Sequence, residues 1–151
     1  MARRPKLTSF FRIPGRLRRM ALEAGWELFR ARLLTMRPAA VYTKQLGEAA
    51  DEHMPLPVPP EDEIAAAQIG AVVARAAAWM PFRALCLQQA IATRRMLTKR
   101  NLPATVFLGL ARDPSERATA DERAHAWVQT GRLVVNGDRD LDRFAVVGTF
   151  A

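Results

Sequence analysis

The sequence has few of the residues that cross-link or anchor a protein. It holds one cysteine among 151 residues. A single cysteine excludes an internal disulfide, so the chain is unlike a stapled secreted domain and a reducing cytoplasm is the expected setting. No apolar run is long enough to span a membrane or to act as the core of a signal peptide after the basic N-terminus. The sequence therefore predicts a cytoplasmic protein and leaves association with a membrane surface open.

The residue sets that bind metals and phosphates are also missing. The chain has two histidines, and one of them, His53, stands beside a proline-rich segment with no other ligand-type residues nearby. One cysteine and two histidines do not provide the ligands of a zinc site. Gly70 is isolated and Gly109 falls inside a predicted strand, so neither belongs to a glycine-rich phosphate loop. We expect no metal and no cofactor.

The charge that is present is mostly positive. Lysine and arginine number 23 against 15 acidic residues, which gives a net charge of +8. Such a balance suits nucleic acid, a membrane surface or an acidic peptide. The arginines of the N-terminal third are scattered and accompany no RNA-binding aromatic motif, so we do not expect nucleic acid. A non-catalytic basic module that binds nucleic acid or a membrane surface remains the alternative to an enzyme.

The chain divides into two regions that we expect to form one compact unit. Residues 1–60 are basic, have a helical pattern and end in a proline-rich connector, and residues 61–151 form the core. Apolar spacing of three and four predicts helices over 16–37, 39–48, 61–80 and 83–100, and runs of branched residues predict strands over 104–110, 123–129, 132–136 and 144–149. Helices followed by an antiparallel sheet predict an α+β fold.

The helix over 16–37 has an unusually wide apolar arc. Two apolar stripes merge along it when successive residues are placed about 100° apart. A helix of this kind either packs into the domain core, or docks a partner protein or a membrane surface. The sequence leaves both interpretations open.

The one cysteine, Cys86, falls in the first turn of the helix predicted over 83–100. Unpaired backbone N–H groups at a helix start stabilise a thiolate, so we expect a depressed thiol pKa. A lone cysteine is otherwise most often a small buried apolar residue. Its place in the chain makes Cys86 a candidate nucleophile.

A candidate base lies in the second predicted strand. His125 has small alanines on both sides, which leave room for a neighbouring element. If Thr130 and Gly131 form a two-residue turn, His125 lies opposite Asn136, and Asp138 is its diagonal neighbour about 7–8 Å away. A bulge at Gly137 would bring the Asp138 carboxylate onto the imidazole. Either Asn136 or Asp138 could orient His125, and thiol, imidazole and orienting group together indicate cysteine catalysis.

These residues carry a resemblance to a known family. Cys86-Leu87 at a helix start, Asn101-Leu102-Pro103-Ala104 before a strand, and Ala124-His125-Ala126-Trp127-Val128 are similar to the B2 leader peptidases of lasso peptide biosynthesis. The likeness covers about residues 80–150 and is looser in the helical N-terminal part. Where the family commonly has an Arg-Ser pair after Cys-Leu, this chain has Gln88-Gln89.

The resemblance implies a transglutaminase-like, papain-related core with the catalytic cysteine at a helix start packed on an antiparallel sheet. It implies a triad of Cys86, His125 and Asp138, since the family's third member is an aspartate. The implied reaction is removal of the leader from a ribosomally made precursor peptide, after which an asparagine synthetase-like cyclase closes the ring of the core peptide. Residues 1–80 lack the short strands of a winged-helix recognition domain, so a separate leader-recognition protein is expected. A transglutaminase-like acyltransferase would share the triad.

Overall fold

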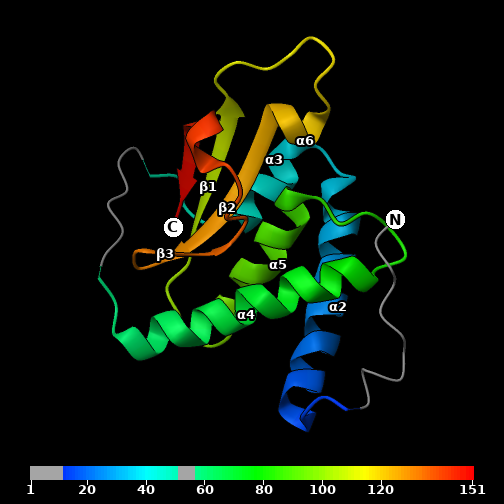
Figure 1. The fold of residues 1–151 in the computed structure, drawn as a ribbon, viewed down its shortest axis with the longest axis vertical. Helices are drawn as coiled ribbons and strands as arrows, with labels where there is room; N and C mark the ends of the chain where they lie inside the picture. The colour runs from blue at the N-terminus through cyan, green and yellow to red at the C-terminus, as the bar shows by residue number, and fades with distance from the viewer. Residues whose placement is uncertain (1–11, 51–56) are drawn as a thin grey trace.

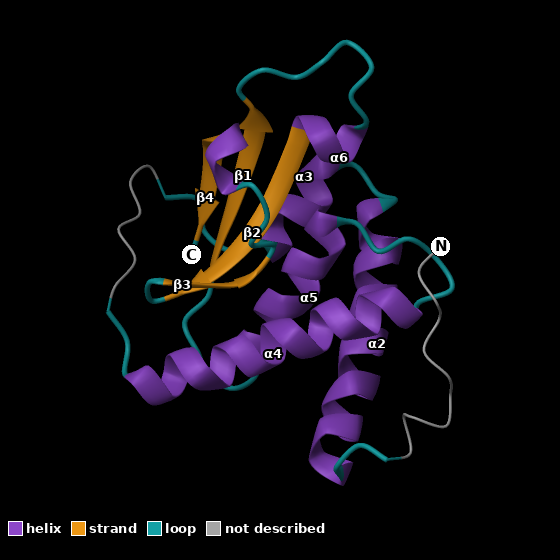
Figure 2. Ribbon diagram, viewed as in Figure 1, coloured by secondary structure: helices purple, strands orange, loops and turns teal. Residues whose placement is uncertain are grey.

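The computed structural model describes residues 12–50 and 57–151, and it confirms the α+β fold (Figure 1, Figure 2). His53 and the first half of the proline-rich connector lie outside the described residues. Helices make up the N-terminal half of the chain, and an antiparallel sheet makes up most of the C-terminal half.

The three long helices begin and end within about three residues of their predicted bounds, whereas the short helix predicted over 39–48 ends at Tyr42. The helices are α2 (Gly15–Thr35), α3 (Ala39–Tyr42), α4 (Pro60–Trp79) and α5 (Cys86–Thr98), with a 3-10 turn, η1 (Thr43–Gln45), after α3. Three acidic residues in the first turn of α4 complement the positive end of its dipole. Asn101 takes the left-handed conformation after α5, with φ of 55°, a conformation in which helices commonly end. No helix in the described residues has the length and apolarity needed to cross a membrane.

Four antiparallel strands form one sheet in the order β3-β2-β1-β4. They are β1 (Thr105–Ala111), β2 (Ala124–Thr130), β3 (Leu133–Asn136) and β4 (Phe144–Phe150), and two short helical segments, α6 (Ala120–Arg123) and η2 (Leu141–Arg143), precede β2 and β4. The four strands match the prediction, whereas α6 forms where a polar loop was expected. Central strand β2 carries the Ala-His-Ala-Trp-Val segment.

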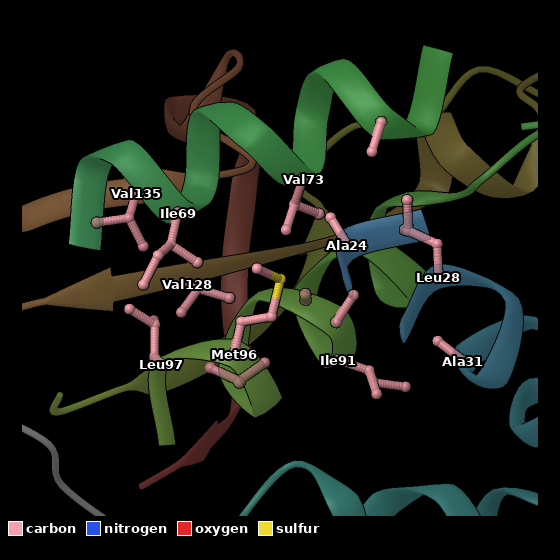
Figure 3. Close-up of a cluster of buried hydrophobic side chains, with 14 of the residues drawn as sticks. Ala24, Leu28, Ala31, Ile69, Val73, Ile91, Met96, Leu97, Val128 and Val135 are labelled. Atoms are coloured by element: carbon pink, nitrogen blue, oxygen red, sulfur yellow. The ribbon is translucent and has the colours of Figure 1, made fainter. Parts of the chain in front are cut away.

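Helices α4 and α5 pack on one face of this sheet, and α2 packs on these two helices, so that α5 lies between α2 and β2. Figure 3 shows side chains from α2, α4, α5, β2 and β3 in one buried cluster. They include Ala24, Leu28, Ile69, Val73, Ile91, Met96, Leu97, Val128 and Val135. The predicted N-terminal region and the predicted core region both contribute to it. Cys86 therefore begins a helix that the core holds on several sides.

The opposite face of the sheet has a small aromatic cluster of its own. Phe107, Trp127 and Phe144 are buried there, and the rings of Phe107 and Trp127 are stacked with centroids 5.5 Å apart. Because alternate residues of a strand point to opposite faces, His125 shares this face with Trp127. The aromatic cluster therefore forms the surroundings of the imidazole.

Candidate active site

The nucleophile candidate is the first residue of α5. Cys86 is half-buried and lines a cleft of about 580 Å³. The start of the helix is fixed by Gln88, whose Oε1 accepts the backbone N–H of Leu85 at 3.0 Å. The Gln88 side chain also donates from Nε2 to Thr35 Oγ1 at 3.0 Å, and it is almost fully buried. One side chain thus holds the cysteine turn to the end of α2.

The thiol is less acidic than its place at a helix start predicts. Burial raises the pKa of Cys86 above its ordinary value, and the negative charge of Asp121 raises the pKa further. Backbone hydrogen bonds from Ala126, Leu87 and Cys86 itself lower the pKa, but they do not outweigh burial. The predicted depression of the thiol pKa is therefore wrong for the chain in this state, because the helix-start effect is smaller than the loss of hydration.

The imidazole of His125 is held in one tautomer. Its Nε2 lies 2.6 Å from the backbone oxygen of Gly137. A carbonyl oxygen can only accept a hydrogen bond, so Nε2 carries the proton and donates. In the neutral ring Nδ1 is then the unprotonated nitrogen, which is able to accept a proton. The ring is buried, with centroids 6.0 Å from Trp127 and 5.1 Å from Phe144, which restricts its orientation.

The β2–β3 hairpin turns one residue later than predicted. Thr130 pairs with Leu133, so Gly131 and Arg132 are the turn residues, and a bulge then brings Val128 opposite Asn136. His125 therefore lies beyond the last paired residue of β3 and does not face Asn136. The turn was misplaced because Gly131 takes the first of the two positions, where its φ of 58° is favourable for glycine.

The chain doubles back to His125 at Gly137, which has a φ of 84°. A Cβ at this position would lie 2.7 Å from the backbone oxygen of Ala126, so the close approach also requires glycine. The sequence predicted that a bulge at Gly137 would bring the Asp138 carboxylate onto the imidazole. The acceptor in the structure is the Gly137 carbonyl.

Asp138 and Asn136, the two predicted orienting groups, both line the cleft. Asn136 is buried, and its Nδ2 approaches the backbone oxygen of Gly70 on α4 at 3.5 Å. Its Oδ1 has no partner among the described residues. Asn136 is therefore directed to α4, which leaves Asp138, next to the Gly137 carbonyl, as the candidate for the third residue of the site.

One wall of the cleft is made of very small side chains, and its rim is charged. Ala67, Gly70, Ala71 and Ala74 form the wall on α4. At the rim, Arg83 and Asp121 form an ion pair of 2.6 Å between the segment before α5 and α6. A smooth wall and a polar rim suit an extended peptide, whose backbone needs space and whose polar groups need partners. Among the described residues no cluster of three or more side chains could hold a metal ion.

Sequence reasoning did not single out Asp121 or give Gln88 a structural role. Asp121 lies in a stretch predicted as loop, and no spacing links it to Cys86. Gln88 stands three residues after the helix-start residue Leu85, which is the position from which a glutamine caps a helix. That spacing could have identified Gln88, whereas Asp121 needed the fold.

Replacing Asp121 with Asn should make Cys86 more reactive. Removal of the negative charge removes one cause of the raised pKa, so the thiolate fraction at a given pH increases. We expect alkylation by iodoacetamide at pH 8 to be severalfold faster, whereas the wild-type rate should still be rising above pH 9.0, the ordinary pKa of the thiol. Glu116→Gln removes the same charge in the exposed loop and should change nothing. Equal rates in all three proteins would contradict the assigned effect of Asp121.

A family model described as the Transglutaminase-like superfamily matches residues 26–149, which includes Cys86, His125 and Asp138. No curated protein matches the chain significantly, and neither does any solved structure.

Proposed function

The chain belongs to the transglutaminase-like superfamily, and from that premise we propose that it is the cysteine peptidase that removes the leader from a lasso peptide precursor. The superfamily includes cysteine peptidases and acyltransferases, and its members are generally cysteine-dependent enzymes. Cys86 is the nucleophile, His125 the base, and Asp138 the group that stabilises the charged imidazole.

One observation carries the proposal. The chain's one thiol lines the same cleft as an imidazole whose Nε2 is committed to the Gly137 carbonyl, so that Nδ1 is available as a base. Cysteine catalysis requires a thiol and an imidazole at one cleft, whereas a buried histidine with a purely structural role does not. The backbone of Ala126, the residue after His125, hydrogen-bonds to the Cys86 sulfur, which joins the two halves of the site.

The raised thiol pKa fits a nucleophile that is ionised only during the reaction. His125 Nδ1 takes the proton from Cys86 as the sulfur attacks the last carbonyl carbon of the leader. Backbone N–H groups at the start of α5 stabilise the oxyanion that forms. The C–N bond breaks as the imidazolium returns its proton to the leaving amine, and the leader remains bound as a thioester. Water, activated by the same histidine, then releases the leader carboxylate and restores the thiol.

The resting site supports partner-dependent activation. Burial and Asp121 both keep Cys86 neutral in the isolated chain, and Asp121 is itself paired with Arg83 at the rim. We propose that a separate leader-recognition protein of the winged-helix type delivers the precursor to the cleft and that the freed core peptide passes to an asparagine synthetase-like cyclase. No ATP or metal is needed for the cleavage step itself.

The test is cleavage of the candidate precursor peptide, followed by mass spectrometry in the presence of the recognition protein. Cys86→Ala should reduce the rate at least about a thousandfold, because the covalent step has no nucleophile, and His125→Ala should do so to a similar degree. Asp138→Asn should reduce the rate about a hundredfold if its carboxylate stabilises the imidazolium.

Asp113→Asn, a change in the exposed loop after β1, is the matched control and should retain the full rate. Circular dichroism must show that all four variants are folded. Normal cleavage by Cys86→Ala would overturn the proposal. Transfer of the leader to an added primary amine in preference to water would instead assign the chain to the acyltransferases of the superfamily.

A further inference from the structure

Helix α2 exposes a continuous row of large apolar side chains. Leu22, Trp26, Phe29 and Leu33 lie along it, and Met36 follows directly after its last residue; they are 63%, 59%, 42%, 51% and 73% exposed. In a soluble protein single exposed apolar residues are ordinary, but a contiguous row of five is not. We call these five residues the outer seam.

The outer seam is separate from the face by which α2 joins the protein. Met20, Ala24, Leu28 and Ala31 are buried against the core on the opposite side of the helix. Figure 1 shows α2 at the edge of the molecule, away from the sheet. The packing that holds α2 in the fold therefore leaves the outer seam uncovered by the rest of the described chain.

The spacing of the outer seam indicates what kind of surface fits it. Its residues follow one another at intervals of four, three, four and three, which is the heptad spacing of a helix–helix seam. At 100° per residue they span an arc of about 80° along about 21 Å of helix, which is narrower than the face that a helix buries in a core. A narrow heptad seam matches a second helix better than the flat surface of a lipid bilayer.

The charges beside the outer seam indicate the sign of the charge that a partner helix should carry. Arg18 and Arg32 flank it on one side, and Arg30 and Arg37 flank it on the other, at the positions that contact the flanks of a partner helix. The two acids of α2 balance little of this charge, because Glu23 and Glu27 pair mainly with basic residues of α5, and only Arg30 among the four arginines contacts one of them, Glu27, at 3.4 Å. A second copy of α2 would place arginine opposite arginine in either direction. Residues 1–11 contain three basic residues and no acid, so their charge does not complement the flanking arginines either.

We infer that the outer seam docks an amphipathic helix of a partner protein whose flanking positions carry aspartate or glutamate. The apolar row supplies the contact area, with Trp26 and Phe29, whose ring centroids are 5.9 Å apart, as its aromatic centre. The arginine flanks select the partner by charge and set its register. The inference concerns binding alone and does not depend on the proposed peptidase activity.

The test uses the full chain and two synthetic peptides of about 21 residues, which match the length of α2. Both peptides carry leucine at the heptad core positions; one has glutamate at every flanking position and the other has lysine. Fluorescence anisotropy of labelled peptide should show saturable binding of the glutamate peptide at least about tenfold tighter than that of the lysine peptide. The double change Arg30→Glu with Arg37→Glu leaves two arginines against two glutamates along the seam, so it should abolish the preference.

Two exposed apolar residues, one in the outer seam and one outside it, provide a variant and its matched control for the binding measurement. Trp26→Ser should weaken binding of the glutamate peptide about tenfold, because it removes the aromatic centre of the seam. Val147→Ser, which removes an equally exposed side chain from β4, should leave binding unchanged. Far-ultraviolet circular dichroism confirms that each variant is folded.

Three results would overturn the inference. The first is equal affinity for the two peptides, or no binding of either. The second is that the protein fails to bind the glutamate peptide but binds phosphatidylglycerol vesicles, and that Trp26→Ser abolishes the vesicle binding. This result would assign the outer seam to a membrane surface. The third is a wild-type dimer in sedimentation velocity that Trp26→Ser converts to monomer, which would assign the seam to a second copy of the chain.

Discussion

Replacing Gly70 with Ala should destabilise the protein by about 3 kcal/mol, the upper end of the usual cost of overpacking. Gly70 lies in the interior of α4, where alanine would otherwise favour the helix. In the fold, however, a Cβ at this position would overlap the backbone oxygen of Val135 on β3. A backbone carbonyl cannot rotate aside as a flexible side chain can, so α4 or β3 must shift. Because both elements line the cleft, the shift should also slow any reaction there.

Gly25→Ala is the matched control, since Gly25 lies in the interior of α2. The nearest atom to its added Cβ is the sulfur of Met80 at 3.9 Å, which is ordinary contact. This change should therefore stabilise the protein by about 0.5–1 kcal/mol through helix propensity alone. Urea unfolding followed by circular dichroism measures both changes. Stabilisation by both alanines would contradict the close approach of α4 to β3.

Glu27→Ala should cost about 3 kcal/mol of unfolding free energy. The Glu27 carboxylate is fully buried and contacts three cations, of which Lys99 is nearest at 2.7 Å and Arg95 lies at 3.3 Å. Breaking a buried ion pair by removing one partner typically costs about 3–5 kcal/mol, because the remaining charge loses its compensation. The low end applies here, since Lys99 and Arg30 are about half exposed and water can solvate them.

Glu23→Ala is the control that separates the effect of burying a carboxylate from the effect of removing a negative charge. Glu23 stands one turn before Glu27 on the same helix and pairs with Arg100 at 2.7 Å, but its side chain is 26% exposed. A partly exposed pair is screened by water and salt, so its removal should cost less than about 1 kcal/mol. Thermal or urea unfolding of the two variants at equal pH gives the comparison. Similar losses for Glu23 and Glu27 would mean that burial of the carboxylate has no special weight in this contact between α2 and α5.

The sequence was sufficient to predict most elements, because each carried a local signal. Apolar spacing of three and four indicated the long helices α2, α4 and α5, and the run of branched residues before Gly109 indicated β1. The short helix α6 was missed because its four residues are too few to show a period. The sequence also left open whether the apolar arc of α2 is core or docking surface. The structure gives one side of the helix to the core and leaves the other exposed.

The candidate site was predicted in part. The positions of Cys86 at a helix start and of His125 in a strand depended on local patterns, and the structure places both on one cleft. The partner of the imidazole could not be predicted, because a one-residue change in the hairpin turn moved Asn136 away from His125. The direction of the shift in the thiol pKa was predicted wrongly for a related reason. Burial and the charge of Asp121 arise only from contacts between distant segments.

The hydrogen bonds that brace the cleft have a consequence for the newly made chain. They join residues far apart in sequence: 53 positions separate Gln88 from Thr35, and 66 separate Asn136 from Gly70. During synthesis at about 5–20 residues per second, about 3–10 s pass between the addition of Cys86 and that of Gly137. For that time the emerging chain has its one thiol but not the turn that positions its imidazole. Until the fold is complete, Cys86 also lacks the burial that raises its pKa, so its thiol is more acidic and more open to oxidation in the nascent chain than in the folded protein.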